Sequence, residues 1–317
     1  MPVSIRPRRS LLYMPGSNPR ALEKARELPV DGLIFDLEDA VAPAAKEKAR
    51  ENVAAALAPT GHVRGLKAHG GYGDRELVLR VNALDSAWGE GDLAAAAALP
   101  LDAVLLPKVE SPETVHRTLA RLDERGAGGR GVGGRLDIWC MLETPRGILA
   151  ARDIAAASPR LAALVLGTSD LTRELHARHT PDRRPLLAAF GLAILAARAH
   201  GLAVLDGVEL DLADDEGFAA LCRQGRELGF DGKTLIHPKQ IAAANAAFGP
   251  SPDDILWSRR VAAAWAAAEA RSEGVVLLDG RLVEALHAAE ARRLLTMAAE
   301  IEKRDREPSL TPAIGER

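Results

Sequence analysis

The sequence predicts a (β/α)8 TIM barrel followed by a C-terminal helical lid extension. Eight short apolar runs, rich in Leu, Val and Ile, alternate with Ala-rich segments of helical pattern between residues 10 and 238. Runs that are apolar at nearly every position are typical of parallel strands buried on both faces, and alternation with helices implies right-handed crossovers. Eight such units close into a barrel, and an open doubly wound sheet is the alternative.

The expected strands and helices alternate along most of the chain. The strands are expected at residues 10–15, 32–39, 76–82, 103–110, 137–144, 163–170, 202–209 and 232–238. Helices are expected between them at residues 19–28, 46–57, 112–125, 148–157, 185–200 and 214–228. Two Gly-rich stretches, 61–76 and 126–135, are expected to be loops. The second contains G-x-G-x-x-G, but it follows a helix and precedes a strand, which is the reverse of a dinucleotide-binding turn.

The chain continues well beyond the eighth expected strand. A helix is expected at 252–271, then an apolar strand-like stub at 274–278, an Asp-Gly turn, and an amphipathic helix carrying Leu282, Leu286, Leu294 and Leu295. Such a segment must pack on the barrel or on another subunit to be stable. We therefore expect a barrel domain at 1–250, a lid or oligomerisation extension at 251–302, and a disordered tail at 303–317.

The composition bounds the class of protein. The 317 residues are 47% hydrophobic, enough for one large core, and the formal net charge of −3 predicts neither nucleic acid nor an anionic membrane as partner. The N-terminal apolar run is too short for a signal peptide, and no run is long enough to span a bilayer. We expect a cytoplasmic protein in which Cys140 and Cys222 are reduced core residues.

Polar residues gather where the expected strands end, which is where barrel enzymes carry their chemistry. They are Asp36, Glu38, Asp39, Arg80, Asn82, Lys108, Glu110, Glu143, Ser169, Asp170, Glu209 and His237. Glu143 and Asp170 close adjacent strands, so their carboxylates should converge and repel unless a proton or a cation lies between them. Hard oxygen ligands of this kind suit Mg²⁺ or Mn²⁺. Pairing with Arg80, Lys108 or Arg146 is the alternative.

Two cations at the same mouth have competing interpretations. An inward-facing Arg80 beside a metal suits a substrate carboxylate or a developing enolate, whereas its alternative is a salt bridge to the carboxylates of "DLED". Lys108 could form a Schiff base, but the surrounding carboxylates should keep it charged and poorly nucleophilic. His176 and His179 ("HARH") are expected to be exposed histidines and not a metal motif.

Several stretches together resemble the citrate lyase β-subunit-like and malyl-CoA lyase family of metal-dependent aldolases and lyases. They are, in order, "RSLLYMPGSNPRALEKA", "GLIFDLEDAV", "LVLRVN", "VLLPKVES", "ETPRGI", "GTSDL" and "IHPKQI". The resemblance implies that Glu143 and Asp170 are Mg²⁺ ligands and that Arg80 binds substrate. It also implies that Glu38 and Asp39 lie near the metal and its waters. The C-terminal stretch resembles the family's lid over a neighbouring subunit, although Glu284 stands where the lyase branch has an aspartate.

The function implied by this resemblance is Mg²⁺-dependent carbon–carbon cleavage of a short 3-hydroxyacyl-CoA, such as malyl-CoA, methylmalyl-CoA or citramalyl-CoA. Acetyl- or propionyl-CoA and a 2-oxo acid would be the products. Arg80, Glu284 and Glu38 are the expected catalytic residues, and Arg80, Glu143 and Asp39 the expected substrate-binding ones. The alternatives are a malyl-CoA-type thioesterase, a citrate lyase β subunit that takes its thioester on an acyl carrier, and a non-catalytic barrel subunit. A homo-oligomer, trimer or hexamer, is expected.

Overall fold

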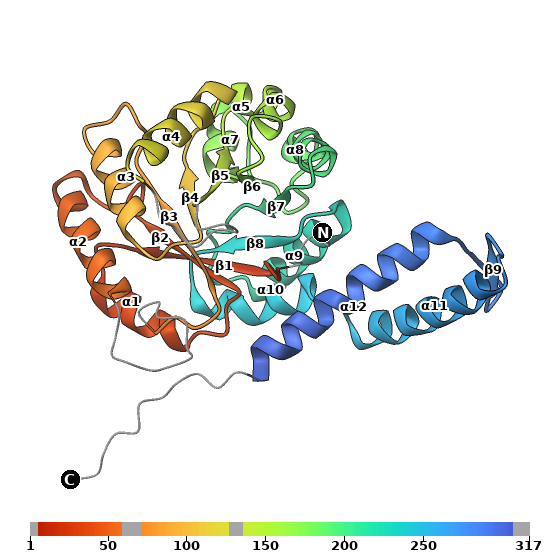
Figure 1. The fold of residues 1–317 in the computed structure, drawn as a ribbon. Helices are drawn as coiled ribbons and strands as arrows, with labels where there is room; N and C mark the ends of the chain where they lie inside the picture. Colours follow the sequence, from red (N-terminus) through yellow and green to blue (C-terminus); the bar gives the residue numbers. More distant parts are fainter. Residues whose placement is uncertain (1–5, 59–70, 127–135, 307–317) are drawn as a thin grey trace, which may run out of the picture. The chain divides into compact units, whose positions relative to one another are not determined.

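The computed structural model describes residues 6–58, 71–126 and 136–306 (Figure 1). Most of the two Gly-rich stretches, and the tail beyond Arg306, lie outside the described residues. The chain divides into two compact units, a barrel unit over residues 8–245 and a C-terminal unit that begins at Ala246.

The barrel unit is a closed, all-parallel barrel in which each strand pairs with the next and the eighth pairs with the first. Its strands are β1 (Ser10–Pro15), β2 (Gly32–Asp36), β3 (Glu76–Arg80), β4 (Ala103–Leu106), β5 (Asp137–Leu142), β6 (Leu161–Leu166), β7 (Ala203–Asp206) and β8 (Gly232–Leu235). The predicted (β/α)8 fold is confirmed, and the helices surround the strands in Figure 1.

The helices of this unit follow the predicted alternation. They are α1 (Pro19–Lys24), α2 (Lys46–Leu57), α3 (Gly89–Ala98), α4 (Pro112–Glu124), α5 (Pro145–Leu149), α6 (Ala151–Ala155), α7 (Thr168–Glu174), α8 (Leu187–Ala199), α9 (Asp215–Leu228) and α10 (Ile241–Phe248), the last of which runs into the C-terminal unit. Short 3-10 turns, η1 (Ala25–Glu27), η2 (Pro43–Ala45), η3 (Arg184–Leu186) and η4 (Pro238–Gln240), adjoin four of them. The sequence did not predict α3, α7 or α10, and the helix expected at 148–157 is two short helices that meet at Ala150.

Every second residue of a strand faces the barrel interior, and this parity positions the site. The interior cluster is apolar and takes alternate residues from successive strands: Leu11, Ile34, Val78, Ala103, Leu105, Trp139, Met141, Ala163, Val165 and Leu205. Continuing the same parity by one step beyond Ile34 and Val78 reaches Asp36 and Arg80, which are register partners on β2 and β3. The interior therefore changes from apolar to charged at the carboxyl ends of the strands.

The C-terminal unit is a helical hairpin with a small β-hairpin at its turn. It contains α11 (Pro252–Ala270), β9 (Val276–Leu278), β10 (Arg281–Val283) and α12 (Ala285–Arg306). Asp279 and Gly280 both have left-handed backbones, with φ of 49° and 76°, as a two-residue type I′ hairpin turn requires. Leu282 therefore lies in a strand and not in the predicted helix, because this turn folds 281–283 back along β9. The final helix also continues through residues 303–306, past the start of the expected tail.

Both cysteines are buried. Cys140 lies on β5 and Cys222 on α9, and neither forms a disulfide. Among the described helices, none is long and apolar enough to cross a membrane.

Candidate functional site

A buried ion pair between Arg80 and Asp36 forms the floor of the candidate site. Arg80 Nε donates to Asp36 Oδ1 at 2.7 Å, and its Nη2 donates to Oδ2 at 2.6 Å. The two residues are only 7% and 0% exposed. The Tyr13 ring lies beneath the guanidinium, 4.7 Å from its carbon, and Met141 Sδ is 3.7 Å from Nη1. A bidentate fork between these surfaces fixes the plane of the guanidinium.

The Asp36 carboxylate is itself held by backbone amides. The N–H groups of Glu38 and Ala40 donate to its two oxygens at 2.9 and 3.1 Å. Asp36 therefore carries four hydrogen bonds, and the loop that follows β2 is folded around it. The sequence offered the "DLED" carboxylates together as partners of Arg80, and the strand register shows that Asp36 is the one opposite it.

Two further side chains fix this loop, which carries Glu38 and Asp39. Lys46 Nζ donates to the carbonyls of Leu37 and Glu38 at 2.9 and 3.0 Å. Asn82 Nδ2 donates to the Leu37 carbonyl at 2.9 Å and to an Asp92 oxygen at 2.6 Å. Asn82, expected at the mouth, therefore supports the loop from below.

Glu38 extends the charged cluster above Arg80. Its Oε2 lies 3.2 Å from Arg80 Nη1, and its Oε1 lies 3.6 Å from Lys108 Nζ. Burial raises the pKa of Glu38, and the opposing effects of Arg80 and Lys108 do not fully offset it. Asp39 is more exposed and lies 3.9 Å from Arg80. The salt bridge of Arg80 with the carboxylates of "DLED", the alternative raised from the sequence, therefore exists: Asp36 pairs with the guanidinium through its fork, and Glu38 and Asp39 lie further from it.

Lys108 contributes its backbone as well as its side chain. Its φ of 47° is left-handed, and its N–H donates to Glu143 Oε1 at 2.7 Å. Burial alone would lower the pKa of the Lys108 ammonium, but the carboxylates of Glu38, Asp39, Glu143 and Asp170 outweigh it and raise the pKa. A lysine held in its charged form is a poor Schiff-base nucleophile, which agrees with the expectation from sequence.

Glu143 is the most buried carboxylate of the group above the floor, at 2% exposed. Burial raises its pKa to about 7, and the negative charges of Asp170 and Glu38 add to this, although the Lys108 N–H and Arg80 oppose it. Gly167, at the end of β6, makes room for the side chain. A Cβ there would lie 2.3 Å from Glu143 Cβ and 2.4 Å from its Oε2.

Asp170 lies in the first turn of α7 and completes the cluster. Its Oδ1 is 2.6 Å from Nη2 of Arg173, an exposed partner one turn away whose pairing is worth about 0.5 kcal/mol. No described residues form a group of three or more His, Cys, Asp or Glu side chains able to hold a metal. The two neighbouring carboxylates of Glu143 and Asp170 fit Mg²⁺, because this ion binds through one or two carboxylates and takes its other ligands from water and substrate.

The other residues expected at the mouth lie elsewhere. Glu110 is 3.6 Å from exposed Arg146, and the His237 ring accepts from the Lys239 amide at the start of η4. Glu209 lines a separate hollow, described below. Glu284 belongs to the C-terminal unit, where its N–H donates to His287 Nδ1 at 3.1 Å. Its catalytic role remains a prediction.

Comparison with known proteins gives a consistent set of relatives. The family model described as HpcH/HpaI aldolase/citrate lyase matches residues 9–238. A (3S)-malyl-CoA thioesterase of Cereibacter sphaeroides is 45% identical over 93% of this chain and 96% of its own. The citrate lyase subunit beta of Escherichia coli is 36% identical over 92% and 94%. The crystal structure of CitE from Mycobacterium tuberculosis in complex with magnesium, acetoacetate and coenzyme A is 31% identical, with a TM-score of 0.70 over 92% of this chain and 97% of that one.

Proposed function

Since the chain belongs to the HpcH/HpaI aldolase/citrate lyase family of enzymes, we propose that it acts on the CoA thioester of a short 3-hydroxy acid such as malyl-CoA, with Mg²⁺ as cofactor. The observation that carries this proposal is the juxtaposition of the Arg80–Asp36 fork with the Glu143 and Asp170 carboxylates. It supplies a fixed cation and a pair of hard oxygen ligands at one mouth.

Glu143 and Asp170 are the residues that would hold the metal, and Mn²⁺ suits the same oxygen ligands. The metal supplies Lewis acidity toward oxygen atoms of the acyl group. The CitE structure, solved with magnesium, supports the choice of cofactor. Gly167 and the Lys108 N–H keep the Glu143 carboxylate in one place, so the ligand is set before substrate arrives.

Arg80 would stabilise the negative charge that develops on the thioester oxygen. Its planar fork is held rigid by Asp36 and Tyr13, so no reorganisation is needed as the charge forms. Asp39, expected to bind substrate, lies at the exposed rim of the same cation. Glu38, with its raised pKa and its position between Arg80 and Lys108, is the barrel residue best suited to move a proton.

We place thioester hydrolysis first among the possible reactions. In that reaction water adds to the thioester carbon, the C–S bond breaks, and the hydroxy acid and CoA thiol leave. The sequence favoured carbon–carbon cleavage. We now place hydrolysis before carbon–carbon cleavage because the chain is 45% identical to malyl-CoA thioesterases over nearly its whole length.

Carbon–carbon cleavage is the second candidate, and the same residues would serve it. The 3-hydroxyl would lose its proton, the C2–C3 bond would break to release the 2-oxo acid, and the acyl-CoA enolate left behind would take up a proton, with Arg80 facing its oxygen. The relatives named citrate lyase subunit beta, at 34–36% identity, favour this reaction. Glu284, supplied by a neighbouring subunit of a trimer or hexamer, is the proposed additional acid or base.

Product analysis separates these reactions. The purified protein with Mg²⁺ would be given malyl-, methylmalyl- and citramalyl-CoA, and a matching acyl-carrier thioester, and the products would be identified by mass spectrometry. Free CoA with the intact hydroxy acid supports hydrolysis; acetyl- or propionyl-CoA with a 2-oxo acid supports cleavage. Turnover of the acyl-carrier thioester alone would indicate a citrate lyase type of subunit. No turnover of any would overturn the proposal and favour a non-catalytic barrel.

A further inference from the structure

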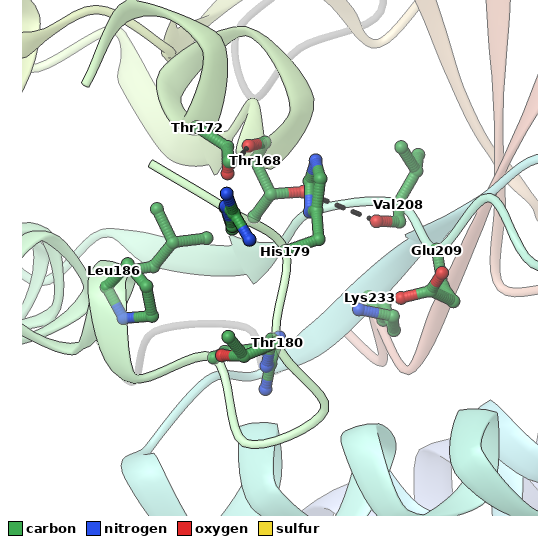
Figure 2. Close-up of a pocket in the computed structure, with 11 residues that line it drawn as sticks. Thr168, Thr172, His179, Thr180, Leu186, Val208, Glu209 and Lys233 are labelled. Carbon is green, nitrogen blue, oxygen red and sulfur yellow. Dashed lines mark hydrogen bonds between the residues drawn. The ribbon is translucent and has the colours of Figure 1, made fainter. Parts of the chain in front are cut away.

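A second polar hollow lies on the outer side of the barrel, between the connection from α7 to α8 and the ends of β7 and β8 (Figure 2). Its volume is about 40 Å³, and its polar wall includes Thr168, Arg178, His179, Arg183, Glu209 and Lys233. Leu205 faces the barrel interior, so Asp206, the next residue of β7, and its register partner Lys233 face outward. The hollow is therefore distinct from the Arg80 site.

The floor of the hollow is formed by two buried cations, Arg183 and Lys233, which share the carboxylate of Asp206 behind it. Asp206 is 0% exposed, Lys233 1% and Arg183 8%. Arg183 Nη1 lies 2.7 and 2.6 Å from the two Asp206 oxygens, and Lys233 Nζ donates to Asp206 Oδ2 at 2.9 Å. Arg183 and Lys233 carry two positive charges and Asp206 only one negative charge. Burying a net positive charge without a counter-ion is unfavourable, so a second anion would stabilise this group.

Neighbouring contacts hold this floor rigid. Arg183 Nε donates to Gln224 Oε1 at 2.7 Å, and the Gln224 amide donates to the Asp182 carbonyl at 2.7 Å. Arg183 takes a left-handed backbone with φ of 52°, which is uncommon for a residue other than Gly. Its position is thus set by the α9 contacts and Asp206.

The exposed part of the wall adds Arg178 and His179. Among the described residues, no ion pair or hydrogen bond joins the Arg178 guanidinium or the His179 ring to another group, and both residues are exposed. Figure 2 shows His179 and Lys233 on the walls and Thr168 hydrogen-bonded to the Val208 carbonyl, at 3.3 Å. The Thr168 hydroxyl donates elsewhere, so the free donors belong to the cationic side chains and the imidazole.

Glu209 is the one carboxylate on the wall, and it does not cancel the positive charge. Its Oε1 accepts the N–H groups of Leu210 and Asp211 at 2.9 and 3.0 Å, which holds it against its own loop. Arg178, Arg183 and Lys233 thus outnumber Asp206 and Glu209, and His179 adds a further donor.

We propose that this hollow binds a small oxyanion, either free phosphate or the carboxylate of a small metabolite. A volume of about 40 Å³ suits a single phosphate or carboxylate group but not a nucleotide or a CoA moiety. The anion would complete the charge balance of the buried group and join Arg178 and His179 to it.

The test is a titration of the full-length protein with inorganic phosphate, and separately with sulfate and acetate, at constant ionic strength adjusted with chloride. Binding is followed by calorimetry and by the ring resonances of His179, assigned with His179→Gln. We expect saturable binding that shifts the His179 resonances and weakens at least tenfold in Arg178→Gln. The matched control is Arg184→Gln, which removes the same charge six residues away from an exposed arginine outside the hollow.

Each outcome decides the proposal. Tighter binding of phosphate and sulfate than of acetate identifies a phosphate site, and the reverse order identifies a carboxylate site. Absence of saturable binding, unmoved His179 resonances, or equal affinities in Arg178→Gln and Arg184→Gln would overturn it. A phosphate site elsewhere on the molecule, such as a CoA-binding surface, would also overturn it, because binding there would neither shift the His179 resonances nor give Arg178→Gln and Arg184→Gln different affinities.

Discussion

Replacing Gly167 by Ala should damage the metal site without touching a ligand. The added Cβ would lie 2.3 Å from Glu143 Cβ and 2.4 Å from Oε2. Carbon atoms in contact normally lie about 3.5 Å or more apart, so Glu143 must move by about 1 Å. The obstructed atom is a Cβ, close to the backbone of β5, so a change of rotamer at the end of the side chain cannot relieve the overlap.

The size of the effect follows from this displacement. Overpacking a well-filled site costs about 1–3 kcal/mol of stability. Moving a metal ligand should weaken Mg²⁺ affinity by about 10- to 100-fold, and a misplacement of about 1 Å at reacting groups lowers kcat/KM by about a hundredfold. The backbone of Gly167, with φ of −97° and ψ of 78°, is not in the left-handed region, so the loss arises from the overlap.

The assay is Mg²⁺ titration calorimetry with urea unfolding and steady-state kinetics on the same preparations. Gly191→Ala is the matched control, because a Cβ at this exposed position in α8 meets nothing within 4 Å. That variant should be neutral or stabilised by up to about 1 kcal/mol. If Gly167→Ala binds Mg²⁺ and turns over like the control, Glu143 is not the ligand that the geometry indicates.

Four further predictions concern the remaining charged groups. Asp36→Asn should cost about 3 kcal/mol of stability and lower kcat/KM about a hundredfold, because Arg80 loses its charged partner. Urea unfolding and steady-state kinetics check this, and a variant with the kcat/KM of the wild type would show that the Arg80–Asp36 pair is purely structural. Glu143→Gln and Asp170→Asn should each abolish Mg²⁺-dependent turnover in a folded barrel, as calorimetry and circular dichroism would show, whereas full activity in EDTA would contradict a metal role. Asp137, whose pKa burial raises to about 6 from an ordinary 3.8, binds its proton more tightly when folded, so stability should rise as pH falls from 6 toward 4. Asp137→Asn should accordingly be more stable than the wild type at pH 8 by about 1 kcal/mol, a value reduced because Asp137 is partly exposed. The difference in stability should vanish below pH 4. A difference in urea unfolding that does not change with pH would refute the raised pKa of Asp137. Glu284→Ala mixed with Asp170→Asn should recover activity after subunit exchange if Glu284 serves a neighbour, and no recovery in verified mixed oligomers would assign it to its own barrel or to no catalytic role.

The barrel could be predicted because its strands are unbroken apolar runs. Each expected strand began within two residues of the observed one, since burial on both faces leaves no ambiguity of period. Several expected strands ended too late. The second was expected to reach Asp39 but β2 ends at Asp36, because the sequence alone does not show where the charged residues leave the strand for the loop. The first strand and the Asp-Gly turn of the β9–β10 hairpin were expected, but its second strand, Arg281–Val283, was assigned to the following helix because it has only three residues.

The site was predictable in its members but not in its contacts. Position at a strand end identified Arg80, Glu38 and Glu143. The roles of Asp36, Gly167 and the Lys108 amide depend on strand register and on a left-handed backbone, neither of which leaves a mark in a single sequence. Likewise, the Arg183–Asp206–Lys233 group joins a loop to two strands, and only the closed barrel brings these together.

The proposed function depends on activation of a 3-hydroxyacyl-CoA thioester by a metal that Glu143 and Asp170 would hold. The most direct measurement is turnover of malyl-CoA in ¹⁸O-labelled water, with product masses read with Mg²⁺, with EDTA, and after Mg²⁺ is restored in excess. We predict malate carrying one ¹⁸O atom together with free CoA, lost in EDTA and recovered with Mg²⁺. Turnover that persists undiminished in EDTA, or malyl-CoA left intact in the presence of Mg²⁺, would contradict it.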